Sequence, residues 1–143
     1  MIERHTLDHK IKTDKMFYDI TDVVAEFAKD TKAYIGFVII QSLHTTAGIK
    51  IMENEEFLID DMERYLEKLA PRSEKYDHDD IKRRPVPDNE RKNAHSHLKA
   101  FFANTTETIP VINGELQLGR WQRIMFVEFD PGRDRIIKLY ATS

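Results

Sequence analysis

The chain contains no cysteine among its 143 residues, so disulfide bonds, thiolate metal ligands and cysteine nucleophiles are all excluded. Glycine and proline are scarce, with five residues of each, which argues against a fibrous or low-complexity chain. No apolar run approaches the roughly 18 residues of a membrane-spanning helix, and the N-terminal residues lack the apolar segment of a signal peptide. These absences predict a cytoplasmic protein with no membrane partner.

An excess of one charge is also missing. The 22 basic and 25 acidic residues give a net charge of −3, so no basic surplus suggests a nucleic-acid partner. With 41% hydrophobic and 33% charged residues, the composition is that of a globular protein. The length suits one domain spanning residues 1–143, in which any metal ion must be bound by nitrogen and oxygen atoms.

Both helical and strand periodicities occur along the chain. Apolar residues recur with helical spacing over residues 55–69, where Asn54 is the candidate N-cap, and shorter helices are predicted near residues 20–32 and 93–102. Residues 2–12 alternate like a half-exposed strand. The nearly continuous apolar run 34–40 predicts a central strand covered on both faces.

The C-terminal part of the chain resembles a β-meander. Strands are predicted over residues 107–112, 115–118, 124–129 and 133–140, with turns at Asn113-Gly114 and at Asp130-Pro-Gly132. Residues 71–93 have almost no apolar side chains, and a segment of that length is usually functional, disordered, or a sign that an element has been misassigned. The pattern therefore predicts one α+β domain with antiparallel strands.

Four of the six histidines lie in separate segments that a fold could bring together: His44, His78, His95 and His97. Three imidazoles that leave one position open are typical of a catalytic zinc site, whereas hydrogen-bonded surface histidines are the alternative. On a helix, His95 and His97 point about 200° apart, so only one would reach a shared ion. In an extended segment both would face the same side. His97 is the preferred ligand, with His95 as its neighbour.

Several other side chains are candidates for chemistry. Thr45 and Thr46 follow an apolar strand, where they could bind an anion or merely complete turn hydrogen bonds. Glu128 interrupts an apolar strand and could face outward, support a histidine, or act as a base, a role for which Asp79 also qualifies. Arg133 could bind phosphate or lie at the surface.

Taken in order, several short pieces resemble the secondary thiamine-phosphate synthase (YjbQ-like) family. They are His44-Thr-Thr-Ala-Gly-Ile49, Tyr76-Asp-His-Asp79, Asn93-Ala-His-Ser-His-Leu98, Ile109-Pro-Val111, Leu118-Gly-Arg-Trp-Gln122 and Glu128-Phe-Asp130 with Arg133. The resemblance implies a β-sandwich-like α+β fold with a largely antiparallel sheet and two to three helices. It also implies a homotrimer and a divalent metal ion bound by His44, His78 and His97.

The implied activity is that of a transferase, which joins a pyrimidine diphosphate to a thiazole phosphate and releases pyrophosphate. The small phosphorylated substrate would contact Thr45, Thr46, His95 and Arg133. Three imidazoles favour Zn²⁺, whereas diphosphate chemistry usually employs Mg²⁺ with oxygen ligands. This mismatch leaves two alternatives: a metal-dependent hydrolase of a small phosphorylated or ester substrate, with Glu128 or Asp79 as its base, or a non-catalytic trimeric metal-binding protein.

Overall fold

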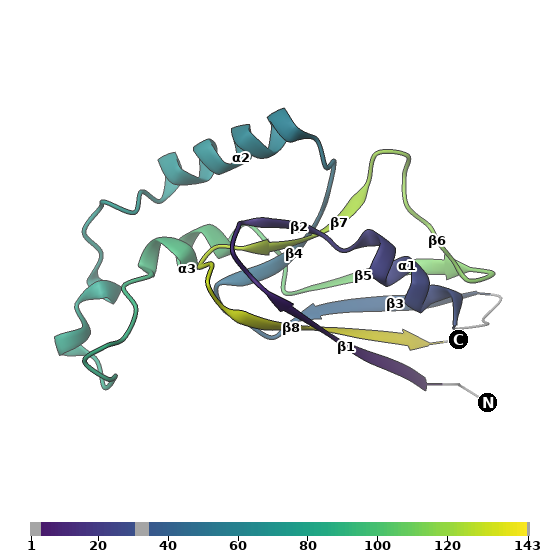
Figure 1. Cartoon of the computed structure of the whole chain (residues 1–143), viewed down its shortest axis with the longest axis horizontal. Helices are drawn as coiled ribbons and strands as arrows, with labels where there is room; N and C mark the ends of the chain where they lie inside the picture. Colours follow the sequence, from purple (N-terminus) through teal and green to yellow (C-terminus); the bar gives the residue numbers. More distant parts are fainter. Residues whose placement is uncertain (1–3, 31–34, 143) are drawn as a thin grey trace.

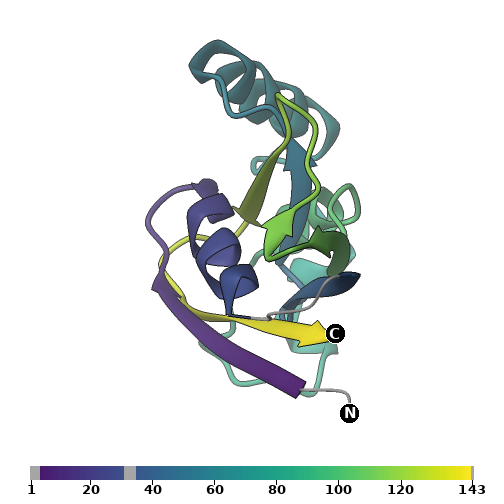
Figure 2. The same cartoon turned by 90° about the vertical axis from the view of Figure 1, so that its right-hand side faces the viewer.

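The computed structural model describes residues 4–30 and 35–142 (Figures 1 and 2). Its elements in chain order are β1 (Arg4–Lys12), β2 (Phe17–Asp19), α1 (Thr21–Lys29), β3 (Ile35–Ser42), β4 (Ala47–Met52), α2 (Glu56–Leu69), the 3₁₀ turns η1 (Asp77–Asp79) and η2 (Ile81–Arg83), α3 (Ala94–Ala100), β5 (Thr106–Ile112), β6 (Glu115–Leu116), β7 (Arg123–Glu128) and β8 (Asp134–Thr142).

The strands form two sheets in which every pairing is antiparallel. The larger sheet has the order β1-β8-β3-β5-β6, and the smaller has the order β2-β7-β4. Figure 1 shows α1 beside the two sheets and α2 standing off above β2 and β7. The α+β expectation, with antiparallel sheets and three helices, is confirmed.

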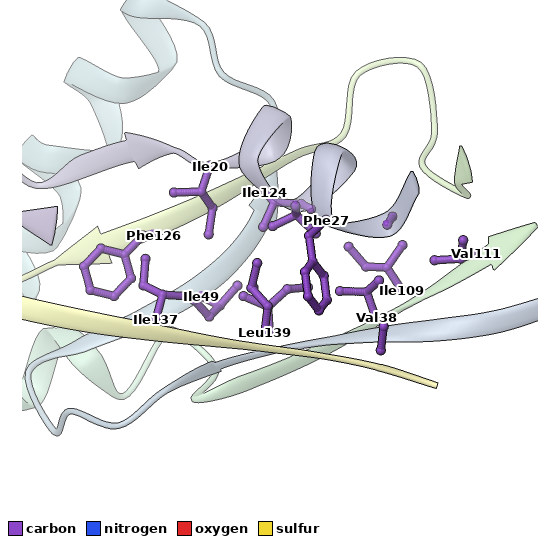
Figure 3. Close-up of a cluster of buried hydrophobic side chains, with 14 of the residues drawn as sticks. Ile20, Phe27, Val38, Ile49, Ile109, Val111, Ile124, Phe126, Ile137 and Leu139 are labelled. Carbon is purple, nitrogen blue, oxygen red and sulfur yellow. The ribbon is translucent and has the colours of Figure 1, made fainter. Parts of the chain in front are cut away.

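The main core lies between the two sheets and α1, and Figure 3 shows its side chains converging from β3, β5, β7 and β8. Val38 and Ile49 are fully buried, as are Ile124 and Phe126. Each large apolar side chain buried in this way contributes about 1.5–3 kcal/mol to folding. Helix α1 adds Val24, whose side chain faces the same interior. This core fixes the strand ends that carry the polar residues described below.

Helix α2 has an amphipathic sequence but only one narrow buried stripe. Leu66 is buried against the smaller sheet, Met62 and Ile59 are partly buried beside it, and Phe57 is 72% exposed. The carboxylate of Glu55, not the predicted Asn54, caps the helix by accepting hydrogen bonds from the first-turn amides. Within the described residues, no helix is long and apolar enough to cross a membrane.

Two predictions about strands are wrong. The run 34–40, of which Tyr34 lies outside the described residues, is not covered on both faces: Val38 is fully buried, but Ile35 is 60% and Phe37 is 47% exposed. Only one face of the larger sheet meets the core, so β3 alternates between inside and outside. An unbroken apolar sequence hides this alternation because its outward residues are apolar too.

The predicted C-terminal meander is also wrong, although its first hairpin is confirmed. Asn113 and Gly114 have φ values of 52° and 77°, as a two-residue turn between β5 and β6 requires. Strand β7, however, pairs with β2 and β4 in the smaller sheet, and β8 returns to the larger one. Sequence patterns did not reveal the short β2 or β4, the partners that draw β7 away.

Candidate functional site

The β3–β4 turn, the β7–β8 turn and α3 meet at one end of the sandwich (Figure 1). Two buried bonds join these segments. The Phe129 amide donates to the Thr46 carbonyl at 2.9 Å, and the Ser96 hydroxyl donates to the Phe129 carbonyl at 2.5 Å. Because these bonds lie in the protein interior, they hold α3 against both turns.

His78 and His97 form a contacting pair at this end. Their rings meet edge to face with centroids 4.7 Å apart. Asp79 accepts a hydrogen bond from the Ala94 amide at 3.0 Å, which ties η1 to the start of α3. Arg84 donates to the His78 carbonyl at 3.0 Å. The loop between residues 71 and 93 is therefore folded back so that one of its histidines reaches α3.

The environment of His97 favours an uncharged ring. Partial burial lowers the pKa of His97 from its ordinary value, and the neighbouring His78 lowers it further. A neutral imidazole has one nitrogen that donates and one that accepts a hydrogen bond. The pair is thus equipped for hydrogen bonding or proton exchange at neutral pH.

His44 is held differently. Its Nε2 accepts a hydrogen bond from the Ile136 amide at 3.2 Å, where the ladder between β3 and β8 has just ended. Burial lowers the pKa of His44, and the nearby Arg135 acts in the same direction. A neutral ring that accepts at Nε2 carries its proton on Nδ1. To bind a metal ion, His44 would have to release the Ile136 amide.

His95 lies apart from the His78–His97 pair, as helix geometry predicts. Its Nδ1 is 3.2 Å from the ammonium nitrogen of Lys99, which is only 1% exposed. Lys99 also binds the Glu67 carboxylate at 2.6 Å. This arrangement connects α3 to the C-terminal part of α2, so His95 contributes to the support of the site.

Glu128 is fully buried beneath the site, so the outward-facing alternative is wrong. Its two carboxylate oxygens accept from Arg135 at 2.6 and 2.8 Å, and one also accepts from the Asp130 amide at 2.9 Å. Arg135 extends the network by donating to the Thr46 hydroxyl at 2.8 Å. As placed, Glu128 supports the two turns from below.

Sequence reasoning considered Arg135 as a phosphate-binding or surface arginine and missed its buried pairing with Glu128, which one signal could have revealed. Arg135 alternates with Ile137, Leu139 and Ala141, so a strand over these residues places its side chain on the buried face. A buried arginine needs an anionic partner. Glu128 is the one carboxylate in the apolar strand that precedes Arg135, so the sequence offered it as this partner.

The remaining predicted residues lie at the same end of the sandwich, but they differ in burial and in their partners. Arg133 binds Asp130 at 2.8 Å, and Asn93 donates to the same carboxylate at 2.9 Å. Burial alone would raise the pKa of Asp130, but hydrogen bonds from Arg133, Asn93 and Arg91 outweigh it and lower the pKa. Thr45 is exposed beside the buried Thr46.

The described residues do not complete the expected three-histidine metal site within one chain. They contain no group of three or more histidine, aspartate or glutamate side chains positioned to hold a metal ion. His78 and His97 together offer two nitrogen atoms, and His44 is turned to the Ile136 amide.

Comparisons with known proteins extend over almost the whole chain. The family model for the UPF0047 protein YjbQ-like family matches residues 5–142. A UPF0047 protein of Archaeoglobus fulgidus is 35% identical over 131 residues, which cover 92% of this chain and 96% of the relative. One of Methanothermobacter thermautotrophicus is 36% identical over 140 residues, which cover 96% and 92%.

Solved structures agree with these matches. A YbjQ-like protein of unknown function from Sulfolobus solfataricus has a TM-score of 0.88 at 28% identity and covers 100% of this chain and 99% of its own. An uncharacterized protein of the same family from Clostridium acetobutylicum has a TM-score of 0.81 at 32% identity, with 93% and 97% covered.

These findings correct the expected function. The family model and the curated relatives carry a family name without an activity, and the Sulfolobus solfataricus structure is described as one of unknown function. Neither thiamine-phosphate synthesis nor a metal-dependent reaction follows from membership, because the family has no established activity. The matches over residues 5–142 do establish that the chain belongs to the UPF0047 (YjbQ-like) family.

Proposed function

We propose that this chain binds a small phosphorylated molecule next to the His78–His97 pair and exchanges protons with it through these imidazoles. The observation that carries the proposal is the contact between the two rings at 4.7 Å, on segments separated in sequence. Imidazoles brought together in this way, with the pKa of His97 lowered by burial, suit acid–base chemistry near neutral pH.

A cavity formed by the 71–93 loop, which carries His78, supports a phosphorylated ligand, although neither ring of the pair lines it. It has a volume of about 810 Å³, within the range of small-molecule sites, and its lining includes Asp79, the residue after His78. Lys75, Lys82 and Lys92 also line it, and none of these ammonium groups is ion-paired within the part of the chain that the structure describes. The carboxylates of Glu74, Asp79, Asp80 and Asp88 share the lining, so its charge is mixed, and the proposed anion would bind through direct contacts with these three ammonium groups.

The binding test uses inorganic phosphate and glycerol phosphate as probes, with affinities measured by calorimetry. Lys82→Met removes one charge-assisted contact, so we expect about tenfold weaker binding. Lys68→Met, which removes a lysine from α2 that does not line the cavity, should leave the affinity unchanged. Equal affinities for both variants and the unaltered protein would refute the proposed cavity.

The role of the imidazoles needs a separate measurement. In nitrogen-detected NMR spectra, phosphate should shift the ring signals of His78 and His97 but leave those of His9, a β1 residue that does not line this cavity, unchanged. His97→Gln should abolish the His78 response if both rings meet the ligand. A protein that binds phosphate without either ring signal moving would separate the cavity from the histidines and contradict the proposal.

A divalent metal ion, Zn²⁺ by ligand type, is a further prediction for the same place. His78 and His97 would supply two nitrogen ligands, and the third would come from a rearranged His44 or from another copy of the chain. Elemental analysis of the His78→Ala, His97→Ala and His9→Ala proteins tests this. Metal content that is equal in all three would contradict it.

Self-association as a homotrimer in the cytoplasm is the last part of the proposal. The outer face of the larger sheet supports it, since Ile35 and Ile112 pair across β3 and β5 and are 60% and 39% exposed. Phe37, on the same face, is 47% exposed. Adjacent exposed apolar side chains suit a subunit interface. Light scattering of the Phe37→Lys protein should show a smaller assembly than that of the unaltered chain.

A further inference from the structure

A second cavity, which shares no lining residue with the first, lies between α2 and the segment from β2 to α1. It has a volume of about 550 Å³. Its floor is apolar and is formed by residues from five elements: Ile11, Phe17, Ile20, Val23, Ile59 and Met125. The lining residues that α2 contributes all fall within residues 56–63, towards the start of this helix, which Figure 1 shows above β2 and β7.

One wall of the cavity carries the carboxylates of Glu56, Asp60 and Glu63. Their spacing of four and three residues places them on one face of α2. Within residues 4–30 and 35–142, none of them forms an ion pair, whereas Asp61 on the next face is paired with Arg64. Like charges at these spacings repel one another and destabilise a helix, so a bound cation would relieve the repulsion.

The other polar groups of the cavity are already engaged. Asp19 binds Arg123 at 2.7 Å and also accepts a hydrogen bond from the Thr21 amide at 2.9 Å. The Tyr18 hydroxyl donates to Asp14, and its ring lies 5.1 Å from the Lys15 ammonium nitrogen. Lys15 and His9 are the basic groups in the lining, so the wall of α2 gives the cavity an acidic character.

We propose that this cavity binds a linear aliphatic polyamine, with its methylene chain on the apolar floor and its ammonium groups against Glu56, Asp60 and Glu63. Helical rise separates Glu56 from Asp60 by about 6 Å and Asp60 from Glu63 by about 4.5 Å along the axis. Ammonium groups separated by three or four methylenes match these intervals. Complementary charge supplies specificity, and the apolar floor supplies contact area.

The test uses putrescine and spermidine as probes and follows the methyl signals of Ile59 and Met125 by NMR. We expect saturable shifts at these floor residues. Butylamine, which has one ammonium group, and butanediol, which has none, should bind progressively more weakly. Absence of saturable putrescine binding, shifts confined to other residues, or equal binding of butanediol would each overturn the proposal.

Two matched variants distinguish binding in the cavity from a general effect of net charge. Asp60→Asn should weaken putrescine binding about two- to fivefold, and adding Glu63→Gln should weaken it further. Asp61→Asn makes the same change in net charge on the neighbouring face and should have no effect. All three side chains are exposed, so the variants should keep the unfolding midpoint of the parent chain. Equal losses for Asp60→Asn and Asp61→Asn would overturn the proposal.

Discussion

Replacing Glu128 by Gln tests how far the candidate site depends on the ion pair beneath it. Glu128 is fully buried and Arg135 is 7% exposed, so neither group can turn to water when its partner is lost. The variant keeps the shape of the side chain but turns an NH₂ group towards the Arg135 donors. Removal of one partner from such a buried pair costs about 3–5 kcal/mol. That cost is a large share of the roughly 5–15 kcal/mol by which a domain is stable.

Urea unfolding followed by circular dichroism measures this cost, provided that the dependence on urea keeps its slope. Lys29→Met, which removes an exposed partner of Glu26, is the control and should change stability by less than about 1 kcal/mol. A double variant, Glu128→Leu with Arg135→Met, removes both charges and should recover most of the loss. If Glu128→Gln alone costs less than about 1 kcal/mol, the pair does not hold the turns together.

Three further predictions concern other parts of the chain. Gly48→Ala should destabilise the fold by about 1–3 kcal/mol in the same urea assay, because a Cβ there would lie 2.8 Å from the Asn104 carbonyl oxygen; an unchanged midpoint would contradict this. Burial alone would raise the pKa of Asp19, but hydrogen bonds from Arg123 and its other partners outweigh it and lower the pKa to about 2. Asp19→Asn should therefore cost about 1–2 kcal/mol near neutral pH, and the difference from the parent should shrink as pH falls below the ordinary value of 3.8. The folded-state pKa of His97 lies below 6.5, so the unfolded chain binds more protons and stability should fall as pH drops through 6.5; urea midpoints that stay constant there would refute this.

The sequence predicted those elements whose patterns are local. Helix α2 and the Asn113-Gly114 hairpin were predicted because helical spacing and turn chemistry act within a few residues. The assignment of β7 and β8 to different sheets was not predictable in this way. It depends on β2, a strand of three residues that has too few positions to show alternation.

The same difference between local and long-range information applies to the candidate site. Helix geometry correctly predicted that His95 and His97 point in different directions, because the angle between two side chains of a helix depends only on their spacing. His95 contacts Lys99, and His97 contacts His78. The sequence could not show whether Glu128 is buried or faces outward, because its burial depends on which face of β7 lies against the larger sheet. Thr46, in the β3–β4 turn, and Arg135, on β8, complete its network although they are 89 residues apart in sequence.

The two members of the histidine pair rest on supports of unequal strength. His97 belongs to α3, which is anchored in the interior by the Ser96 hydroxyl. His78 lies on a 3₁₀ turn of three residues with no buried side chain. Segments with few buried contacts open at the lowest free-energy cost. The contact between the rings therefore depends on the order of the 71–93 loop, and a ligand that bridges both rings would stabilise the loop as it binds. Amide exchange of the loop should then slow when phosphate is added, while exchange in β7 and β8 stays unchanged.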